Sequence, residues 1–166
     1  MTGRSLALLA LACVLAGWGC RAPAPATPRD AEPINLGFAE IELYSAEQLG
    51  FRLHADGTIT NADGARLGRI TRDGKIVSRT GETLAMLTAD GFVVDGEGKR
   101  TNARVLPDGT LEIHGRRHRF EEDGTLSGGK PGAPTIRAAG LTRASRRAAM
   151  FLLVAILMPK AAPALR

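Results

Sequence analysis

The sequence predicts an all-β fold, an antiparallel meander or rolled sheet of repeated short hairpins, with an N-terminal signal helix and a C-terminal apolar helix. Three observations support this prediction. Asp-Gly occurs seven times, apolar residues stand at fixed distances from it, and Gly accounts for 20 of the 166 residues while aromatic residues make up only 4%. Many glycines and few aromatics favour tight turns and small core side chains over an aromatic-rich enzyme cleft.

The chain begins with a segment that is typical of export signals, predicted to cover residues 1–19. Arg4 gives it a positive start, and Leu6–Leu15 is an apolar run much shorter than the roughly 20 residues that span a bilayer. Small residues then lead to a cysteine in the stretch Ala-Gly-Trp-Gly-Cys20. One interpretation is an ordinary secretory signal cleaved near Gly19, which would leave Cys20 as a free thiol.

The same 20 residues resemble a bacterial lipoprotein precursor, although Gly17 stands where that family has Leu or a similar residue. The resemblance implies cleavage before Cys20 and lipidation of that cysteine, which would anchor the exported chain to a membrane of the cell envelope, on its periplasmic or surface face. Cys13 lies in the removed segment, so the mature chain would keep one cysteine and form no internal disulfide. Residues 20–33 are then the lipidated Cys and a Pro/Ala linker, which favours extended polyproline II.

Residues 34–128 are predicted to form a β-hairpin repeat domain. Five Asp-Gly pairs follow one another at intervals of 17, 17, 18 and 15 residues, and a second glycine series at 64, 81, 98 and 115 has a constant step of 17. The unit is therefore about 17 residues long and contains two turns. The residues predicted to form the first turn of each unit, with a structural role, are Asp56, Gly57, Asp73, Gly74, Asp90, Gly91, Asp108, Gly109, Asp123 and Gly124.

Apolar residues stand three places before and three places after each of these aspartates. This symmetry predicts a three-residue hairpin loop, x-Asp-Gly, in which Gly takes the left-handed conformation of a G1 bulge and the Asp carboxylate accepts nearby backbone N–H groups. Positions two away are mostly polar, which predicts a sheet with one apolar and one wet face. The facing pairs expected are Leu53 with Ile59, Ile70 with Ile76, Leu87 with Val93, Val105 with Leu111, and Phe120 with Leu126.

The C-terminal part is predicted to consist of a linker at 129–140, a basic and apolar helix at 141–158, and a tail at 159–166. Ala148–Met158 is apolar all round, which indicates burial on more than one side, and about 16 Å of helix is too short to cross a bilayer. Two interpretations stay open. The helix caps the apolar face of the sheet, or it dips into an anionic lipid surface with Arg143, Arg146 and Arg147 as the membrane-surface contacts.

The charge of the chain is unevenly distributed. Residues 34–128 hold 12 Lys/Arg against 15 Asp/Glu, whereas residues 129–166 hold 7 basic residues and no acidic one. The basic character therefore belongs to the C-terminal part. Because aromatic residues are not interleaved with basic ones either, nucleic acid is not expected as a partner.

The sequence shows no motif for catalysis and predicts no catalytic residue, cofactor or metal site. The Asp-Gly turns lack the ligand spacing of an EF-hand, and a Gly-x-Ser-x-Gly motif is missing. His114 and His118 form the cluster nearest to a metal site, but a third ligand at suitable spacing is missing. We therefore expect a non-enzymatic envelope lipoprotein that acts as a structural or interaction scaffold for an unknown protein or glycan. The alternative is a metal-dependent enzyme or metal-binding protein that uses the His114/His118 region.

Overall fold

The computed structural model describes residues 34–129, 132 and 134–158. By its contacts the chain divides into two compact units, Met1–Asp30 and Ala31–Arg166, and all described residues belong to the second. The predicted signal peptide at 1–19, the predicted lipidation site Cys20, the linker up to residue 33 and the tail at 159–166 lie outside the described residues.

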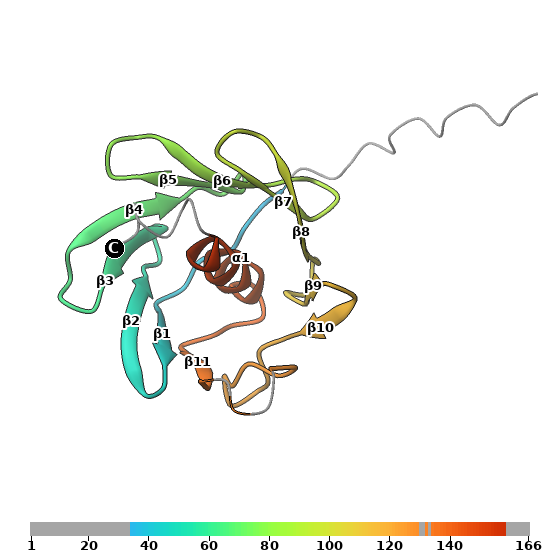
Figure 1. Ribbon diagram of the computed structural model, residues 1–166. Helices are drawn as coiled ribbons and strands as arrows, with labels where there is room; N and C mark the ends of the chain where they lie inside the picture. Colours follow the sequence, from blue (N-terminus) through green and yellow to red (C-terminus); the bar gives the residue numbers. More distant parts are fainter. Residues whose placement is uncertain (1–33, 130–131, 133, 159–166) are drawn as a thin grey trace, which may run out of the picture. The chain divides into compact units, whose positions relative to one another are not determined.

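The described part is predominantly β, with one short C-terminal helix, as the sequence predicts. The elements are β1 Ile41–Ser45, β2 Gln48–Leu53, β3 Thr58–Asn61, β4 Arg66–Ile70, β5 Lys75–Ser78, β6 Thr83–Leu87, β7 Phe92–Asp95, β8 Arg100–Val105, β9 Leu111–Ile113, β10 Arg116–His118, β11 Ile136–Ala139 and α1 Arg146–Leu157. The strands form one antiparallel sheet in which β10 to β1 follow chain order and β11 lies beside β1. Figure 1 shows this sheet curling around α1, which lies inside the curve.

The last strand and the helix start differ from the predicted boundaries. The expected linker at 129–140 contains β11, which pairs with β1 so that Ala139 lies opposite Glu42. The helix begins at Arg146 rather than near residue 141, because Thr142 and Ser145 form a hydrogen-bonded turn in front of it. The Ser145 amide donates to the Thr142 carbonyl over 3.2 Å, and the Thr142 amide donates to Ser145 Oγ over 3.0 Å.

The predicted hairpin geometry is confirmed at all five Asp-Gly turns. The expected apolar pairs face each other across the ladder, from Leu53 opposite Ile59 to the isolated bridge between Phe120 and Leu126. In the first turn the Gly57 amide donates to the His54 carbonyl over 2.9 Å, and Gly57 has a φ of +85°. The other four turn glycines also have φ above +80°, as a type I turn with a G1 bulge requires.

Successive Asp-Gly turns are joined to one another by backbone hydrogen bonds, which we call stitching bonds. The Gly57 carbonyl accepts the Ile70 amide over 2.8 Å, and the Gly74 carbonyl accepts the Leu87 amide over 2.7 Å. The Gly91 carbonyl likewise accepts the amide of Val105 over 2.7 Å. All five glycines of this series are buried, whereas those of the second series, at the opposite ends of the strands, are exposed.

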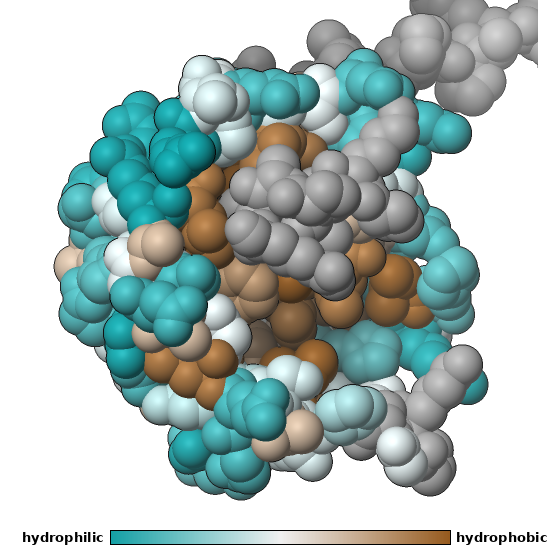
Figure 2. Space-filling view, turned by 60° about the vertical axis from the view of Figure 1, so that its left-hand side comes forward, coloured by the Kyte–Doolittle hydropathy of each residue, from teal (hydrophilic) through white to brown (hydrophobic). Residues whose placement is uncertain are grey.

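The core lies between the inner face of the sheet and α1. The inward residues of the hairpin pairs are almost fully buried except Leu126, which is half-buried, and residues 148–155 of the helix are buried as well. Phe151 is the largest side chain with no exposed surface. The helix therefore caps the apolar face of the sheet, and Figure 2 shows polar residues surrounding an apolar interior. Among the described residues, no helix has the length and apolar character needed to cross a membrane.

Candidate functional site

The regular ladder of the sheet ends at β10 on one side and at β11 on the other. Residues 119–128 lie between these two edge strands, and we call this segment the seam. It forms two isolated bridges, Phe120 with Leu126 and Thr125 with Arg137. The Leu126 amide also donates to the Ile136 carbonyl over 2.9 Å. The seam therefore closes the curl of the sheet with fewer bonds than the strands elsewhere make.

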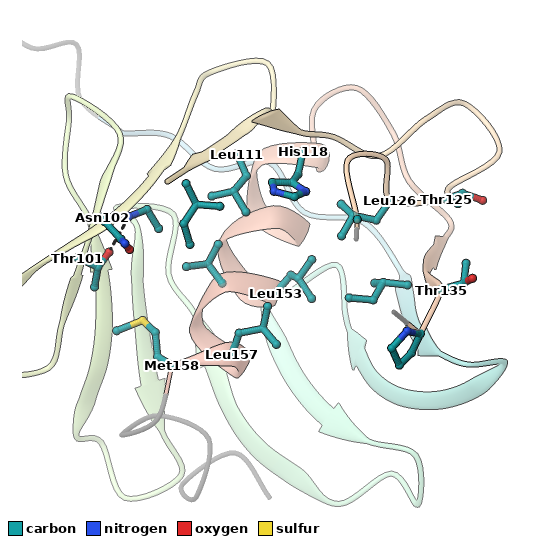
Figure 3. A pocket seen from close by; sticks show the side chains of 16 residues that line it. Thr101, Asn102, Leu111, His118, Thr125, Leu126, Thr135, Leu153, Leu157 and Met158 are labelled. Atoms are coloured by element: carbon teal, nitrogen blue, oxygen red, sulfur yellow. Dashed lines mark hydrogen bonds between the residues drawn. The ribbon is translucent and has the colours of Figure 1, made fainter. Parts of the chain in front are cut away.

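An apolar cavity of about 680 Å³ lies beside the seam, at the C-terminal end of α1. Its walls come from β8, β9, β10, the seam, the start of β11 and the last turns of the helix. In Figure 3, Leu153 and Leu157 of α1 lie on one side, with Leu111 and Leu126 across from them. Leu157 is 66% exposed, the one large hydrophobic side chain so exposed among the described residues. The volume falls within the range of small-molecule pockets, which are mostly apolar with few polar groups.

Most polar groups in this cavity already have partners within the protein. Thr101 Oγ1 donates to the Val93 carbonyl over 2.7 Å, and the Asn102 amide nitrogen lies 2.9 Å from the His114 ring. His118 Nδ1 lies 3.2 Å from the Ser127 carbonyl oxygen. Because a carbonyl only accepts, Nδ1 carries the proton, and in the neutral ring Nε2 is left as an acceptor. The cavity therefore offers a mostly apolar surface with a few polar groups, among them His118 and the hydroxyls of Thr125 and Thr135.

A second cavity, of about 600 Å³, lies near the N-terminal end of α1. Three arginines line it: Arg119 of the seam, Arg143 of the turn before the helix and Arg146 of the first helical turn. Of the three predicted membrane-surface arginines, the structure thus brings two together. Arg147 does not line this cavity; it is half-buried, and burial lowers the pKa of its guanidinium. Asp108 is the acidic residue in the lining.

The turn aspartates lie at successive hairpin ends and bond locally. Asp56 Oδ1 accepts the Thr58 amide over 2.8 Å and Asp108 Oδ1 accepts the Thr110 amide over 2.9 Å. The hydrogen bonds from Thr58 hold the pKa of Asp56 below its ordinary value. Hydrogen bonds from Lys75 and then from Thr71 do the same for the pKa of Asp73. These hydrogen bonds all lie within the hairpin turn to which each carboxylate belongs.

The two histidines of the alternative prediction lie in different surroundings. His114 is exposed in the turn between β9 and β10, with a φ of +50°, and its ring contacts Asn102. His118 lines the apolar cavity and contacts the Ser127 carbonyl. Within residues 34–129, 132 and 134–158, no group of three or more His, Cys, Asp or Glu residues is placed to hold a metal ion.

Sequence reasoning did not identify either cavity, although the repeat contains a signal for both. The interval between the last two marker aspartates is 15 residues instead of 17 or 18. This shortened unit contains β10 and the start of the seam, and its residues line both cavities. The irregular step of the repeat thus marks the place where the sheet changes its pairing.

No family model, curated protein or solved structure matches the chain.

Proposed function

We propose that the chain is an exported, lipid-anchored binding protein without catalytic activity, whose rolled sheet holds a small apolar molecule beside the seam. The observation that supports this most is the apolar cavity of about 680 Å³ between α1 and the seam. The helix fills the centre of the rolled sheet, and at its C-terminal end it leaves this apolar space between its last turns and the sheet.

The lining defines the chemical class of the ligand. Apolar side chains from the sheet, the seam and α1 make up most of the wall, so removal of apolar ligand surface from water supplies the affinity. His118 and the hydroxyls of Thr125 and Thr135 add a few polar groups to this lining. The ligand is therefore a mainly apolar molecule with a small number of polar groups.

Export and lipidation form the second half of the proposal, and they rest on the first 20 residues. Lipid at Cys20 would hold the domain at a membrane of the envelope, where apolar molecules are available for capture. Mass spectrometry of the mature N-terminus is expected to show a chain that begins at an acylated Cys20. A Cys20→Ala variant is expected to leave the membrane fraction, and retention of that variant with the membrane would contradict Cys20 as the anchor.

Binding can be measured with N-phenyl-1-naphthylamine, an apolar probe whose fluorescence increases when it moves from water into an apolar site. We expect saturable binding by the full chain. A Leu157→Gln variant removes an exposed wall residue without disturbing the core, and it is expected to weaken binding about 3- to 10-fold. A Thr135→Trp variant places a large ring in the cavity from its exposed rim and is expected to abolish saturable binding.

The matched control is Leu106→Gln, which makes the same chemical change at a half-buried residue outside the cavity lining. It is expected to bind the probe as the unchanged chain does. Absence of saturable binding would contradict the proposal, and so would equal weakening by Leu106→Gln and Leu157→Gln.

A further inference from the structure

The stitching bonds between Asp-Gly turns are interrupted at one step. Gly57, Gly74 and Gly91 each bond the next hairpin through their carbonyl oxygens, and Gly124 bonds Ala138 in the same way over 2.8 Å. Among the described residues, Gly109 makes no equivalent backbone bond to the hairpin that follows it. Instead, the start of α1 packs on this turn, where a Cβ added to Gly109 would lie 2.8 Å from the Cβ of Arg146.

The cavity of about 600 Å³ lies at this interruption, and its lining holds three arginines against one carboxylate. Three guanidinium groups line it, contributed by the seam, the turn before the helix and the helix itself. The lining carboxylate, Asp108, is engaged by the amide and the hydroxyl of Thr110 at 2.9 and 3.0 Å. Arg119 pairs with Glu121 over 3.1 Å. Within the described residues, Arg143 and Arg146 have no carboxylate within ion-pair distance.

Arg146 also has an unsatisfied donor. Its Nε atom is buried and, in the described part of the chain, has no hydrogen-bond partner. A buried donor without an acceptor costs free energy of folding, and the Nε atoms of Arg137 and Arg147 share this condition outside the cavity. The first turn of α1 contains no acidic residue, and the Ser145 side chain makes no capping bond to it, so the positive end of the helix dipole is not neutralised.

We propose that this cavity binds a phosphate-type anion, held by Arg143 and Arg146 with Arg119 at its edge. Guanidinium groups present paired N–H donors that match phosphate oxygens, which makes arginine the residue suited to this ligand. The anion is either a free phosphate or the phosphate of a lipid headgroup. The site is separate from the apolar cavity, with which it shares no lining residue.

The test uses the full chain carrying Cys20→Ala, so that acylation cannot hold it on lipid. Titration calorimetry with inorganic phosphate at low ionic strength measures binding of the free anion. Flotation with phosphatidylglycerol vesicles, compared with phosphatidylcholine vesicles, measures binding of the headgroup. Arg143→Gln and Arg146→Gln are each expected to weaken the observed binding about 10- to 100-fold. Arg143 is exposed, so its variant retains the fold even if the Arg146 variant does not.

Arg79→Gln is the matched control. Arg79 is also exposed and lies outside this cavity, and its substitution removes the same charge. It is expected to bind like the unchanged chain. Binding of phosphate that is lost with Arg143 supports a free anion as ligand, and vesicle binding alone that is lost with Arg143 supports a headgroup. Absence of both, or equal weakening by Arg79→Gln and Arg143→Gln, would overturn the proposal.

Discussion

Glycine at positive φ occurs in this domain in two different environments, one at each end of the strands. A Cβ built on Gly57 would lie 2.3 Å from the Ile70 carbonyl oxygen, whereas a Cβ on Gly64 would meet nothing within 4 Å. Their φ angles are nearly the same, +85° and +82°. The pair thus separates the cost of the left-handed backbone conformation from the cost of the close contact.

We expect Gly64→Ala to lower the free energy of unfolding by about 1–2 kcal/mol, the usual cost of a non-glycine residue in the left-handed region. Gly57→Ala should cost clearly more, because its methyl group would also lie 2.3 Å from the Ile70 carbonyl oxygen and displace the residue whose amide makes the stitching bond. Urea unfolding of the full chain measures both. Equal losses in the two variants would show that the stitching contact has no energetic weight.

The turn aspartates make the stability of the domain dependent on pH. The folded protein holds the pKa of Asp56, Asp73 and Asp90 below the ordinary value, through hydrogen bonds from Thr58, Lys75 and Thr88 respectively. A carboxyl with a lowered folded pKa contributes stability above its unfolded pKa of about 4 and loses it as the pH falls through the folded value. The free energy of unfolding should therefore be constant above about pH 5 and decrease below pH 4.

Asp56→Asn tests the assignment at one site. Asparagine keeps an oxygen that can accept the Thr58 amide but does not titrate, so the decrease between pH 5 and pH 3 should become shallower in the variant. Denaturant unfolding at a series of pH values gives the comparison. An unchanged pH profile would assign the acid sensitivity to other carboxyl groups.

At the scale of the element, α1 belongs to the core and not to the surface. Residues 148–155 are buried by the curled sheet, while Leu157 at the end of the helix is largely exposed. Phe151→Ala should therefore lower the free energy of unfolding by about 3–5 kcal/mol. Leu157→Ala in the same helix should cost below about 1 kcal/mol. Thermal or urea unfolding followed by circular dichroism measures both, and similar losses would contradict the central packing of the helix.

The hairpins were predictable from sequence because their information is local. Each turn needs Gly at one position, an oxygen acceptor before it and apolar residues three places away, and all of these lie within seven residues of sequence. Strand β11 was not predictable in this way, because Ile136–Ala139 has no turn partner nearby and its pairing with β1 joins residues almost 100 positions apart. The end of the meander alone could not indicate which strand would cover its edge.

The two cavities are lined by residues that lie far apart in the sequence and meet only in the folded chain. Arg119, Arg143 and Arg146 meet because the helix returns to the interrupted step between Gly109 and the next hairpin. The sequence grouped Arg143, Arg146 and Arg147 by proximity in the chain, whereas the fold separates Arg147 and adds Arg119. Leu126 and Leu157 likewise meet at the apolar cavity only through the closure of the sheet.

At the scale of the whole molecule, the closure of the sheet is unequal around its circumference. From β10 to β1 and on to β11, each strand is paired with its neighbour, with register shifts in four of the pairs, and stitching bonds join most of the turns. At the seam, the sheet is closed by isolated bridges and a few backbone hydrogen bonds. Local opening follows the regions with fewest bonds, so the seam should be the first part of the closed sheet to open, and both cavities adjoin it.

Hydrogen exchange of the backbone amides tests this directly. The amides of Ile70 and Leu87, which make stitching bonds under the regular ladder, should exchange only through global unfolding. At the seam, the Leu126 amide donates to the Ile136 carbonyl and the Ser127 amide donates to the Arg119 carbonyl. These two amides should exchange faster, by a subglobal opening that is less sensitive to denaturant. Phe151→Ala should speed the first pair more than the second, because the helix supports the ladder whereas the seam already opens on its own. Identical exchange of the two pairs in the unchanged chain would show that the seam unfolds only together with the rest of the sheet.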